Sequence, residues 1–313
     1  MGIFSREQLN VLTADLDLFR PSGLNDASRI DLTDGGPFVA IDTRSPYEID
    51  DAIRVRRQRS GGFIVQAAIA DGAQIPTDSD IVTAALKAKE STYRGKRCVN
   101  SMLPEVAIRQ LELAPSRAPQ RALVVETQFD RDALPKGDVS VYPATVKAEA
   151  FRQAEFATRY LRREGPRAPI AQFVEAFRSH RSDLQYELPE ALGGTQSNVI
   201  FGGRLLQDYM VLTNHAFTQH SLQRSVPVLC RRYPDIPAIW GHGSAPSDPS
   251  LRLLGENHTE GFTPGIPYAR ATSPLHEGAS LANHLLFGAY MADADQAELT
   301  ELASRMQREL EAV

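Results

Sequence analysis

The sequence has only two cysteines, Cys98 and Cys230, which lie far apart and form no CxxC pattern. This scarcity argues against a disulfide framework or a structural zinc site, and it favours a reducing compartment. No apolar run approaches the roughly 18 residues that a membrane-spanning helix needs, and the N-terminal stretch MGIFSREQLN lacks the apolar core of a signal peptide. We therefore expect a cytoplasmic protein with no membrane partner.

An excess of positive charge is also missing. The 313 residues include 34 Lys and Arg against 39 Asp and Glu, a formal net charge of −5. A basic protein would have pointed directly to nucleic acid, but a local basic channel can exist on an acidic protein. The charge therefore leaves that class of partner open. Hydrophobic residues make up 42% and charged residues 23%, a composition typical of globular proteins.

Strand-like patterns dominate the first half of the chain and helical patterns the second. Strands are predicted at 38–41, 52–57 and 63–70, with a hairpin turn at Ser60–Gly62, and in RALVVETQFD, DVSVYPATVKAEA and VPVLCRR. Helices are predicted near 6–13, in DSDIVTAALKAKEST, in FRQAEFATRYLRR, near 169–181, in FGGRLLQDYMVLTNHAFTQHSL, and at about 274–290 and 294–312. This order predicts an α+β fold, with residues 1–36 as an N-terminal lead-in and 37–313 as one domain.

The stretch FVAIDTRSPYEIDDAIRV places four carboxylates in one loop between apolar strands: Asp42, Glu48, Asp50 and Asp51. Two carboxylates 4 Å apart repel by roughly 4 kcal/mol at an effective dielectric of about 20. A bound divalent cation removes this cost, and Mg²⁺ prefers such oxygen ligands. The spacing therefore predicts a metal site, while a solvated acidic turn remains the alternative.

A second candidate segment is YARATSPLHEGASLANHLLF. Ser273 and Pro274 match the N-cap and first position of a helix, and a helix N-terminus attracts phosphate. Arg270 and His276 lie on either side of this start. The alternative is an ordinary capped helix with no ligand.

Five stretches occur in a characteristic order: AIDTRSPYEIDDAI, VQAAIADGAQIPTDSDI, SMLP, PVLCRRYPDIP and YARATSPL followed by NH. Together they resemble the motifs of the ribonuclease II / ribonuclease R family, the RNB catalytic domain. The resemblance covers about residues 38–285. It implies a mixed or antiparallel sheet wrapped by helices around a channel for single-stranded RNA. It also implies a processive 3′→5′ exoribonuclease that uses two Mg²⁺ ions, with Mn²⁺ as a substitute, and releases nucleoside 5′-monophosphates.

The resemblance assigns roles to individual residues. Asp42, Asp50 and Asp51 match the family's metal-binding aspartates, and Asp50 matches the one most closely tied to hydrolysis. Glu48 stands where the family has Asp, and its extra methylene moves the carboxylate by about 1 Å, beyond the roughly 0.5 Å that active sites tolerate. His276 stands where the family has its catalytic arginine, and neutral His is a poor substitute. Arg270 is expected to supply the missing charge.

RNA contacts are carried over in the same way. An aromatic residue that stacks on the 3′-terminal base corresponds most nearly to Tyr93, and a tyrosine of the long hairpin is replaced by Phe151. The remaining expected RNA-binding residues are Asp208, Arg231, Arg232, Thr272 and Ser273. Base stacking on an aromatic ring typically contributes about 1–3 kcal/mol.

The family usually flanks this domain with cold-shock OB domains and an S1 domain, for which 37–313 has no room, so we expect reduced processivity. Three functions stay open. The first is an active metal-dependent exoribonuclease with a variant site. The second is a degenerate RNB protein that binds RNA or a protein partner and cuts little or nothing. The third is a metal-dependent phosphodiesterase that acts on short oligonucleotides or nucleotides.

Overall fold

The computed structural model describes residues 28–42, 48–94, 97–114, 118–163, 165, 167–179, 195–231, 251–254 and 268–312. The chain divides into two compact units whose segments alternate along the sequence. We call Arg29–Ile69 with Leu113–Thr213 the sheet unit, and Met1–Ser28, Ala70–Glu112 and Asn214–Val313 the helical unit. The helix predicted near 6–13 lies outside the described residues, and the domain boundary after residue 36 stays a prediction.

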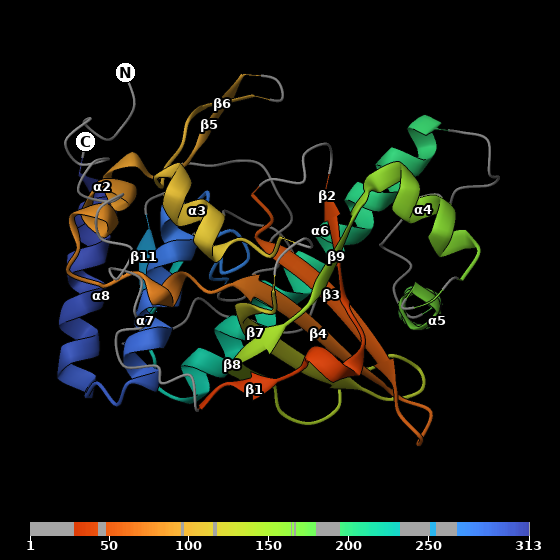
Figure 1. Cartoon of the computed structure of the whole chain (residues 1–313). Coiled ribbons are helices and arrows are strands. Elements are labelled where there is room, and N and C mark those ends of the chain that lie inside the picture. The colour runs from red at the N-terminus through yellow and green to blue at the C-terminus, as the bar shows by residue number, and fades with distance from the viewer. Residues whose placement is uncertain are drawn as a thin grey trace. The chain divides into compact units, whose positions relative to one another are not determined.

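The sheet unit is built on one seven-stranded sheet with the order β1-β8-β7-β4-β3-β2-β9 (Figure 1). β1 pairs with β8 and β2 with β9 in parallel, whereas β2–β3, β3–β4 and β7–β8 are antiparallel. The predicted α+β fold with a mixed sheet is therefore confirmed. The strands are β1 Ile30–Asp31, β2 Phe38–Asp42, β3 Asp51–Arg57, β4 Phe63–Ala70, β7 Gln120–Phe129, β8 Ser140–Val146 and β9 Ala148–Arg152.

The hairpin between β3 and β4 forms where the sequence predicts it. Gly61 has a φ of 91°, a left-handed conformation that glycine adopts without steric cost. The turn closes because the N–H of Gln58 donates to the carbonyl of Gly62 at 2.8 Å. The register then runs without a break from Asp51 opposite Ile69 to Arg57 opposite Phe63. This continuous pairing fixes where the acidic loop enters the sheet.

A buried arginine ties the sheet to the segment that precedes it. Arg54 is 3% exposed; its Nε donates to Gln66 Oε1 at 2.9 Å, and its Nη1 donates to the carbonyls of Leu32 and Gly36, each at 2.9 Å. The guanidinium also lies 4.2 Å from the centre of the Phe38 ring. Burial lowers the pKa of Arg54 to about 10, so the group stays charged at neutral pH. These contacts offset much of the cost of burying the charge, although the buried Nη2 makes no hydrogen bond with the described residues.

Among the described residues of the sheet unit, three helices lie wholly or partly in it: α4 Gln153–Leu161, α5 Arg167–Ser179 and the first part of α6 Thr195–Gln223. Phe173 of α5 meets Phe63 and Phe129 of the sheet edge-on, with ring centres 5.5 and 4.8 Å apart. The helix predicted from Phe151 begins only at Gln153 because Phe151 still pairs with Ile41 as part of β9.

The helical unit has α7 Gly278–Met291 in its core, and every residue of α7 from Gly278 to Gly288 is buried. The apolar cluster around it includes Leu86, Leu103, Leu281 and Met306. The β5–β6 hairpin and α3 were not predicted from the sequence. The other elements are α2 Asp80–Ala88, β5 Thr92–Arg94, β6 Arg97–Asn100, α3 Glu105–Leu111, β10 Val228–Arg231, β11 Leu251–Leu254 and α8 Gln296–Glu311. Two 3-10 turns, Thr33–Gly35 and Gly72–Gln74, complete the described elements of the chain. Across the described parts of both units, no helix is long and apolar enough to cross a bilayer.

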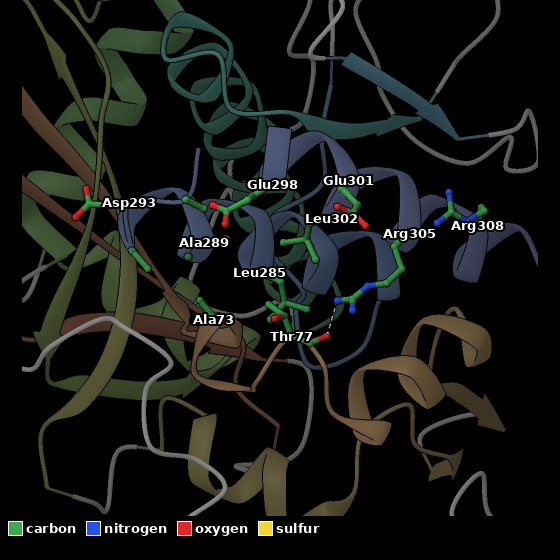
Figure 2. Close-up of a pocket in the computed structure, with 13 residues that line it drawn as sticks. Ala73, Thr77, Leu285, Ala289, Asp293, Glu298, Glu301, Leu302, Arg305 and Arg308 are labelled. Atoms are coloured by element: carbon green, nitrogen blue, oxygen red, sulfur yellow. Dashed lines mark hydrogen bonds between the residues drawn. The ribbon is translucent and has the colours of Figure 1, made fainter. Parts of the chain in front are cut away.

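A cavity of about 770 Å³ lies in the helical unit between the turn at Gly72–Gln74 and helices α7 and α8 (Figure 2). Its lining residues include apolar Ala73 and Leu285. Arg305, which also lines it, donates to the carbonyl of Thr77 at 2.8 Å. The turn and α7 approach each other so closely that a Cβ on Gly288 would lie 2.6 Å from the Cβ of Ala73. This contact requires glycine at position 288.

Replacing Gly288 by alanine should therefore destabilise the protein. The methyl group would overpack the contact with Ala73, at a typical cost of about 1–3 kcal/mol, although Ala favours helices over Gly by up to about 1 kcal/mol. Denaturant unfolding measures the change. The double variant Ala73→Gly/Gly288→Ala removes the clash and should recover most of the loss. A Gly288→Ala variant as stable as the parent would contradict this packing.

His215 in α6 should make stability depend on pH. Burial lowers the pKa of His215 from 6.5 to about 4. The unfolded chain takes up this proton near pH 6.5 and the folded chain only near pH 4, so stability is lost as the pH falls between these values. In His215→Gln, the free energy of unfolding should fall less steeply over this range in denaturant titrations. Equal slopes for parent and variant would rule out His215 as a source of the dependence.

Candidate functional site

The acidic loop leaves the sheet at the end of β2 and returns at the start of β3. Asp42 is the last residue of β2, and its side chain lies outside the described part of the chain. β2 and β3 are antiparallel neighbours, with Val39 opposite Ile53, so the two ends of the loop meet the same edge of the sheet. Asp50 is buried, at 7% exposure, and Asp51 beside it is half-buried. The sheet thus brings the two ends of the loop together.

Glu48 occupies an unusual backbone conformation. Its φ of 70° lies in the left-handed region, which Asp and Asn adopt several times more often than most other residues with a side chain. Position 48 is also the one where the resembled family has Asp. The backbone here therefore suits the shorter acid better than the Glu that this chain carries. Glu48 is half-buried, and its backbone is strained.

The donor set of the loop fits a hard divalent cation. All four candidate ligands are carboxylates, which Mg²⁺ and Mn²⁺ prefer, and the loop contains no thiol or imidazole that would favour a softer metal. Among the side chains that the structure describes, no three His, Cys, Asp or Glu gather as a metal site. The Asp42 carboxylate is not among those side chains. The loop therefore fits the metal by its chemistry, and its four residues remain the candidate ligands.

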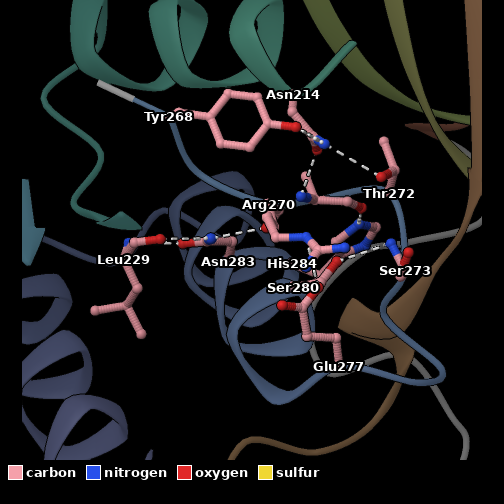
Figure 3. Close-up of polar contacts among 11 residues, drawn as sticks. Asn214, Leu229, Tyr268, Arg270, Thr272, Ser273, Glu277, Ser280, Asn283 and His284 are labelled. Atoms are coloured by element: carbon pink, nitrogen blue, oxygen red, sulfur yellow. Dashed lines mark hydrogen bonds and ion pairs between the residues drawn. The ribbon is translucent and has the colours of Figure 1, made fainter. Parts of the chain in front are cut away.

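The second candidate segment, 268–273, lies in the helical unit and is held by side chains of α6 (Figure 3). The Oδ1 of Asn214 accepts from the N–H of Ala271 at 2.7 Å, and its Nδ2 donates to Tyr268 at 2.9 Å and Thr272 at 3.3 Å. One turn along α6, Thr218 accepts from the N–H of Ala269 at 2.8 Å. The buried side chain of Thr272 therefore helps to hold this segment against α6.

Helix α7 holds the same segment from the other side. Asn283 donates to the carbonyls of Arg270 at 2.9 Å and Leu229 at 3.0 Å, and accepts from the N–H of Leu229 at 2.8 Å. Buried His284 lies 2.7 Å through Nε2 from the carbonyl of Ala271. Ser280 accepts from the N–H of Ser273 at 3.0 Å. A segment with almost no regular structure is thereby fixed in position.

The helix start predicted at Ser273 is wrong. α7 begins at Gly278, with Glu277 as its N-cap, and Ser273 instead closes a turn whose carbonyl accepts from the N–H groups of His276 and Glu277. The reason is a bridge to the segment after α2, where the N–H of Ser91 donates to the carbonyl of His276 at 2.8 Å. His276 is therefore not in the first turn of a helix, so the helix terminus no longer supports a phosphate there, and the role of His276 stays a prediction.

Three charged or aromatic candidates cluster around this bridge. Tyr93 on β5 is 47% exposed, and its hydroxyl lies 3.1 Å from Nδ1 of His276, with the two rings edge to face. Arg270 forms an ion pair with Glu277, in which Nε and Oε2 are 2.8 Å apart. The helical unit thus brings together Tyr93, Arg270, Thr272, Ser273 and His276, while Asp42, Glu48, Asp50 and Asp51 belong to the sheet unit.

The other predicted RNA-binding residues are placed less fully. Phe151 on β9 is 9% exposed, and the guanidinium of Arg167 lies 3.9 Å from its ring centre, so one face of the ring already has a partner. Asp208 lies on α6 and Arg231 ends β10, but their side chains fall outside the described residues, as does all of Arg232. Burial raises the pKa of the neighbouring Cys230 thiol, which disfavours a metal-binding or nucleophilic role.

Sequence reasoning missed Asn214 and Glu277. The sequence does contain a pattern that indicates the hydrogen bonds holding 268–273. Ser280, Asn283 and His284 lie at i, i+3 and i+4 on one face of an otherwise apolar helix. Asn214 and Thr218 repeat that spacing on α6. Polar residues in a buried helical face need partners, which here are backbone groups of 268–273. Glu277 gave no such signal.

Several solved structures share the fold of this chain. The chain is similar to RNase R of Mycoplasma genitalium in complex with ribose methylated single-stranded RNA, with a TM-score of 0.73 and 18% identity over 98% of this chain and 58% of that one. It is similar to yeast Ssd1, a pseudonuclease, with a TM-score of 0.66 and 14% identity over 94% and 45% of the two chains. For an active-site mutant of the Dss1 exoribonuclease of Candida glabrata, the TM-score is 0.63 and the identity 15%, over 98% and 49%.

The chain thus spans 45% to 58% of the length of these three structures, and identities this low establish the fold alone. No curated protein sequence matched it. The sequence profile of the RNB domain, however, matches residues 29–193. These residues include the acidic loop and every strand of the seven-stranded sheet. Because this match extends over more than half of the 313 residues, the chain belongs to the RNB domain family.

Proposed function

We propose that this protein is a metal-dependent exoribonuclease that hydrolyses single-stranded RNA from the 3′ end. The observation that carries the proposal is the loop of four carboxylates between β2 and β3, inside the matched RNB domain. The RNase R structure with single-stranded RNA supports RNA as the substrate class. Nucleoside 5′-monophosphates are the expected products, and the cytoplasm is the expected compartment.

The acidic loop would supply the chemistry of the site. Asp42, Glu48, Asp50 and Asp51 would hold Mg²⁺ or Mn²⁺ through their carboxylates. When bound, the metal neutralises charge on the scissile phosphate and makes the attacking water more acidic. Asp50 is buried immediately before the start of β3. It would orient this water and accept its proton. The water oxygen bonds to phosphorus, the bond from phosphorus to O3′ of the preceding nucleotide breaks, and that O3′ takes up a proton.

The helical unit would bind the RNA. Exposed Tyr93 offers a ring on which a base stacks, and its bond to His276 fixes the orientation of that ring. Arg270 supplies a guanidinium for a phosphate, in place of the arginine that the resembled family has at position 276. The side chains of Asp208 and Arg231 lie outside the described residues. Their part in RNA binding therefore stays an expectation from the resemblance.

A second candidate function is RNA binding with little or no cleavage. The observation that favours it is the substitution at the phosphate clamp, where position 276 is His and the nearby Arg270 is paired with an acid. Ssd1 is a pseudonuclease of similar fold. The two functions differ in one result, since a binder that lacks activity retains labelled RNA intact in the presence of metal.

The decisive assay follows 5′-labelled single-stranded RNA with Mg²⁺, with Mn²⁺ and with a chelator. A ladder that shortens from the 3′ end, only when metal is present, is expected, and a circular RNA should stay uncut. Asp50→Asn should slow cleavage by about 10²–10⁴-fold, the usual contribution of a positioned proton acceptor, while RNA binding in chelator is unchanged. Cuts in the circle would refute exonuclease action, and unaltered rates in Asp50→Asn would refute its role.

Metal binding by the acidic loop can be tested without any turnover. Titration calorimetry with Mn²⁺ should show binding that weakens by more than about tenfold in Asp42→Asn/Asp51→Asn, since loss of even outer-shell partners typically costs that much. The double variant Asp78→Asn/Asp80→Asn removes the same charge near the start of α2 and is the matched control. Equal Mn²⁺ affinity in the parent and in Asp42→Asn/Asp51→Asn would exclude the acidic loop as the site.

A further inference from the structure

A buried carboxylate faces a half-buried arginine in the helical unit (Figure 3). The side chain of Glu277 is 6% exposed, whereas that of Arg270 is 36% exposed. Although Glu277 is the N-cap residue of α7, its side chain makes no capping hydrogen bond. Burying a carboxylate is unfavourable unless it is paired, so the ion pair with Arg270 explains why a carboxylate is tolerated there.

Both residues of the pair are anchored through their backbones. On one side, the N–H of Gly278 donates to the carbonyl of Lys89 at 2.6 Å, and Glu277 itself bridges to Glu90. On the other, Asn283 holds the carbonyl of Arg270, and the N–H groups of its two neighbours are held by α6. The direction in which the guanidinium points is therefore set by Glu277 and not by a flexible loop.

The ion pair leaves most of the guanidinium for another partner. Its closest approach to Glu277 is through Nε, and the guanidinium makes no hydrogen bond or ion pair with any other residue that the structure describes. The N–H groups on Nη1 and Nη2 form a planar fork that matches two oxygens of a phosphate.

We propose that Glu277 is a positioning residue that orients Arg270 as a clamp for one phosphate of single-stranded RNA. The proposal rests on the proposed function and adds to it a residue without any assigned role. Glu277 does not touch the RNA, so its removal acts on RNA only through Arg270.

The first measurement is RNA binding in chelator, where no cleavage occurs. The variant Arg270→Gln/Glu277→Gln removes both charges together and avoids a stranded buried carboxylate. A plot of log affinity against log salt for single-stranded oligoadenylate should flatten by about 0.7, the share of one phosphate contact. Arg109→Ala, which removes another exposed arginine paired with a glutamate, is the control and should not change the slope. An unchanged slope in the double variant would overturn the proposal.

The second measurement separates positioning from folding. In Glu277→Gln the arginine keeps its charge but loses its fixed direction, so kcat should fall by about tenfold or more with KM and the salt slope unchanged. Glu277→Asp, which retains the carboxylate, should recover part of kcat. If Glu277→Gln instead lowers only the melting temperature, with kcat per folded molecule unaltered, Glu277 is structural and the proposal fails.

The two proposals fail separately. A parent protein that cuts no RNA under any metal condition contradicts the proposed nuclease function, and the binding slopes alone then decide whether Arg270 holds a phosphate. In that case an unaltered slope in Arg270→Gln/Glu277→Gln overturns the clamp as well. A flattened slope retains the clamp as part of an RNA-binding surface.

Discussion

The helical unit depends on how a buried, irregular segment satisfies its backbone. Among the described residues, 268–273 make one isolated main-chain bridge, between Ala269 and Cys230 of β10, and buried N–H and carbonyl groups are costly when unpaired. Side chains of two helices take over the role of a neighbouring strand: Asn214 and Thr218 from α6, and Ser280, Asn283 and His284 from α7. Asn214 and Asn283 each serve as donor and acceptor at once, because a carboxamide carries both an NH₂ group and a carbonyl oxygen.

This constraint also explains the positions of the exposed groups. Because the backbone of 268–273 is held by α6 on one side and α7 on the other, the Cα position of Arg270 is fixed. The bridge between Glu90 and Glu277, with Ser91 bonded to His276, brings the segment before β5 alongside the turn before α7. Tyr93 reaches His276 only through this bridge. A loss of Asn214 or Asn283 would therefore disturb several candidate RNA contacts without touching RNA.

The fold was predictable where apolar periodicity was strong. β4 and β7 read as long apolar strands because both faces are covered, and the structure places them as predicted within a residue or two. The hairpin β5–β6 was missed because its short strands, TYR and RCVN, are mostly exposed and carry no alternation. The false helix start at Ser273 shows the limit of local signals. Ser-Pro satisfies every local rule for a cap, but a bridge to residues far along the chain prevails. The left-handed φ of Glu48 is likewise invisible in a sequence.

In the proposed clamp, the carboxylate of Glu277 beside Arg270 changes the electrostatics of phosphate binding in a calculable way. At an effective dielectric of about 20, a phosphate about 4 Å from a lone guanidinium gains roughly 4 kcal/mol, and a carboxylate about 8 Å from that phosphate repels it by roughly 2 kcal/mol. An arginine paired with Glu277 thus keeps about half of the attraction of an unpaired one. What the pair contributes in return is a fixed direction, because a side chain that is already held loses less rotamer entropy on binding. The two effects oppose each other and are of similar size, so a paired arginine at 270 would hold a phosphate about as strongly as an unpaired one, but in a fixed direction.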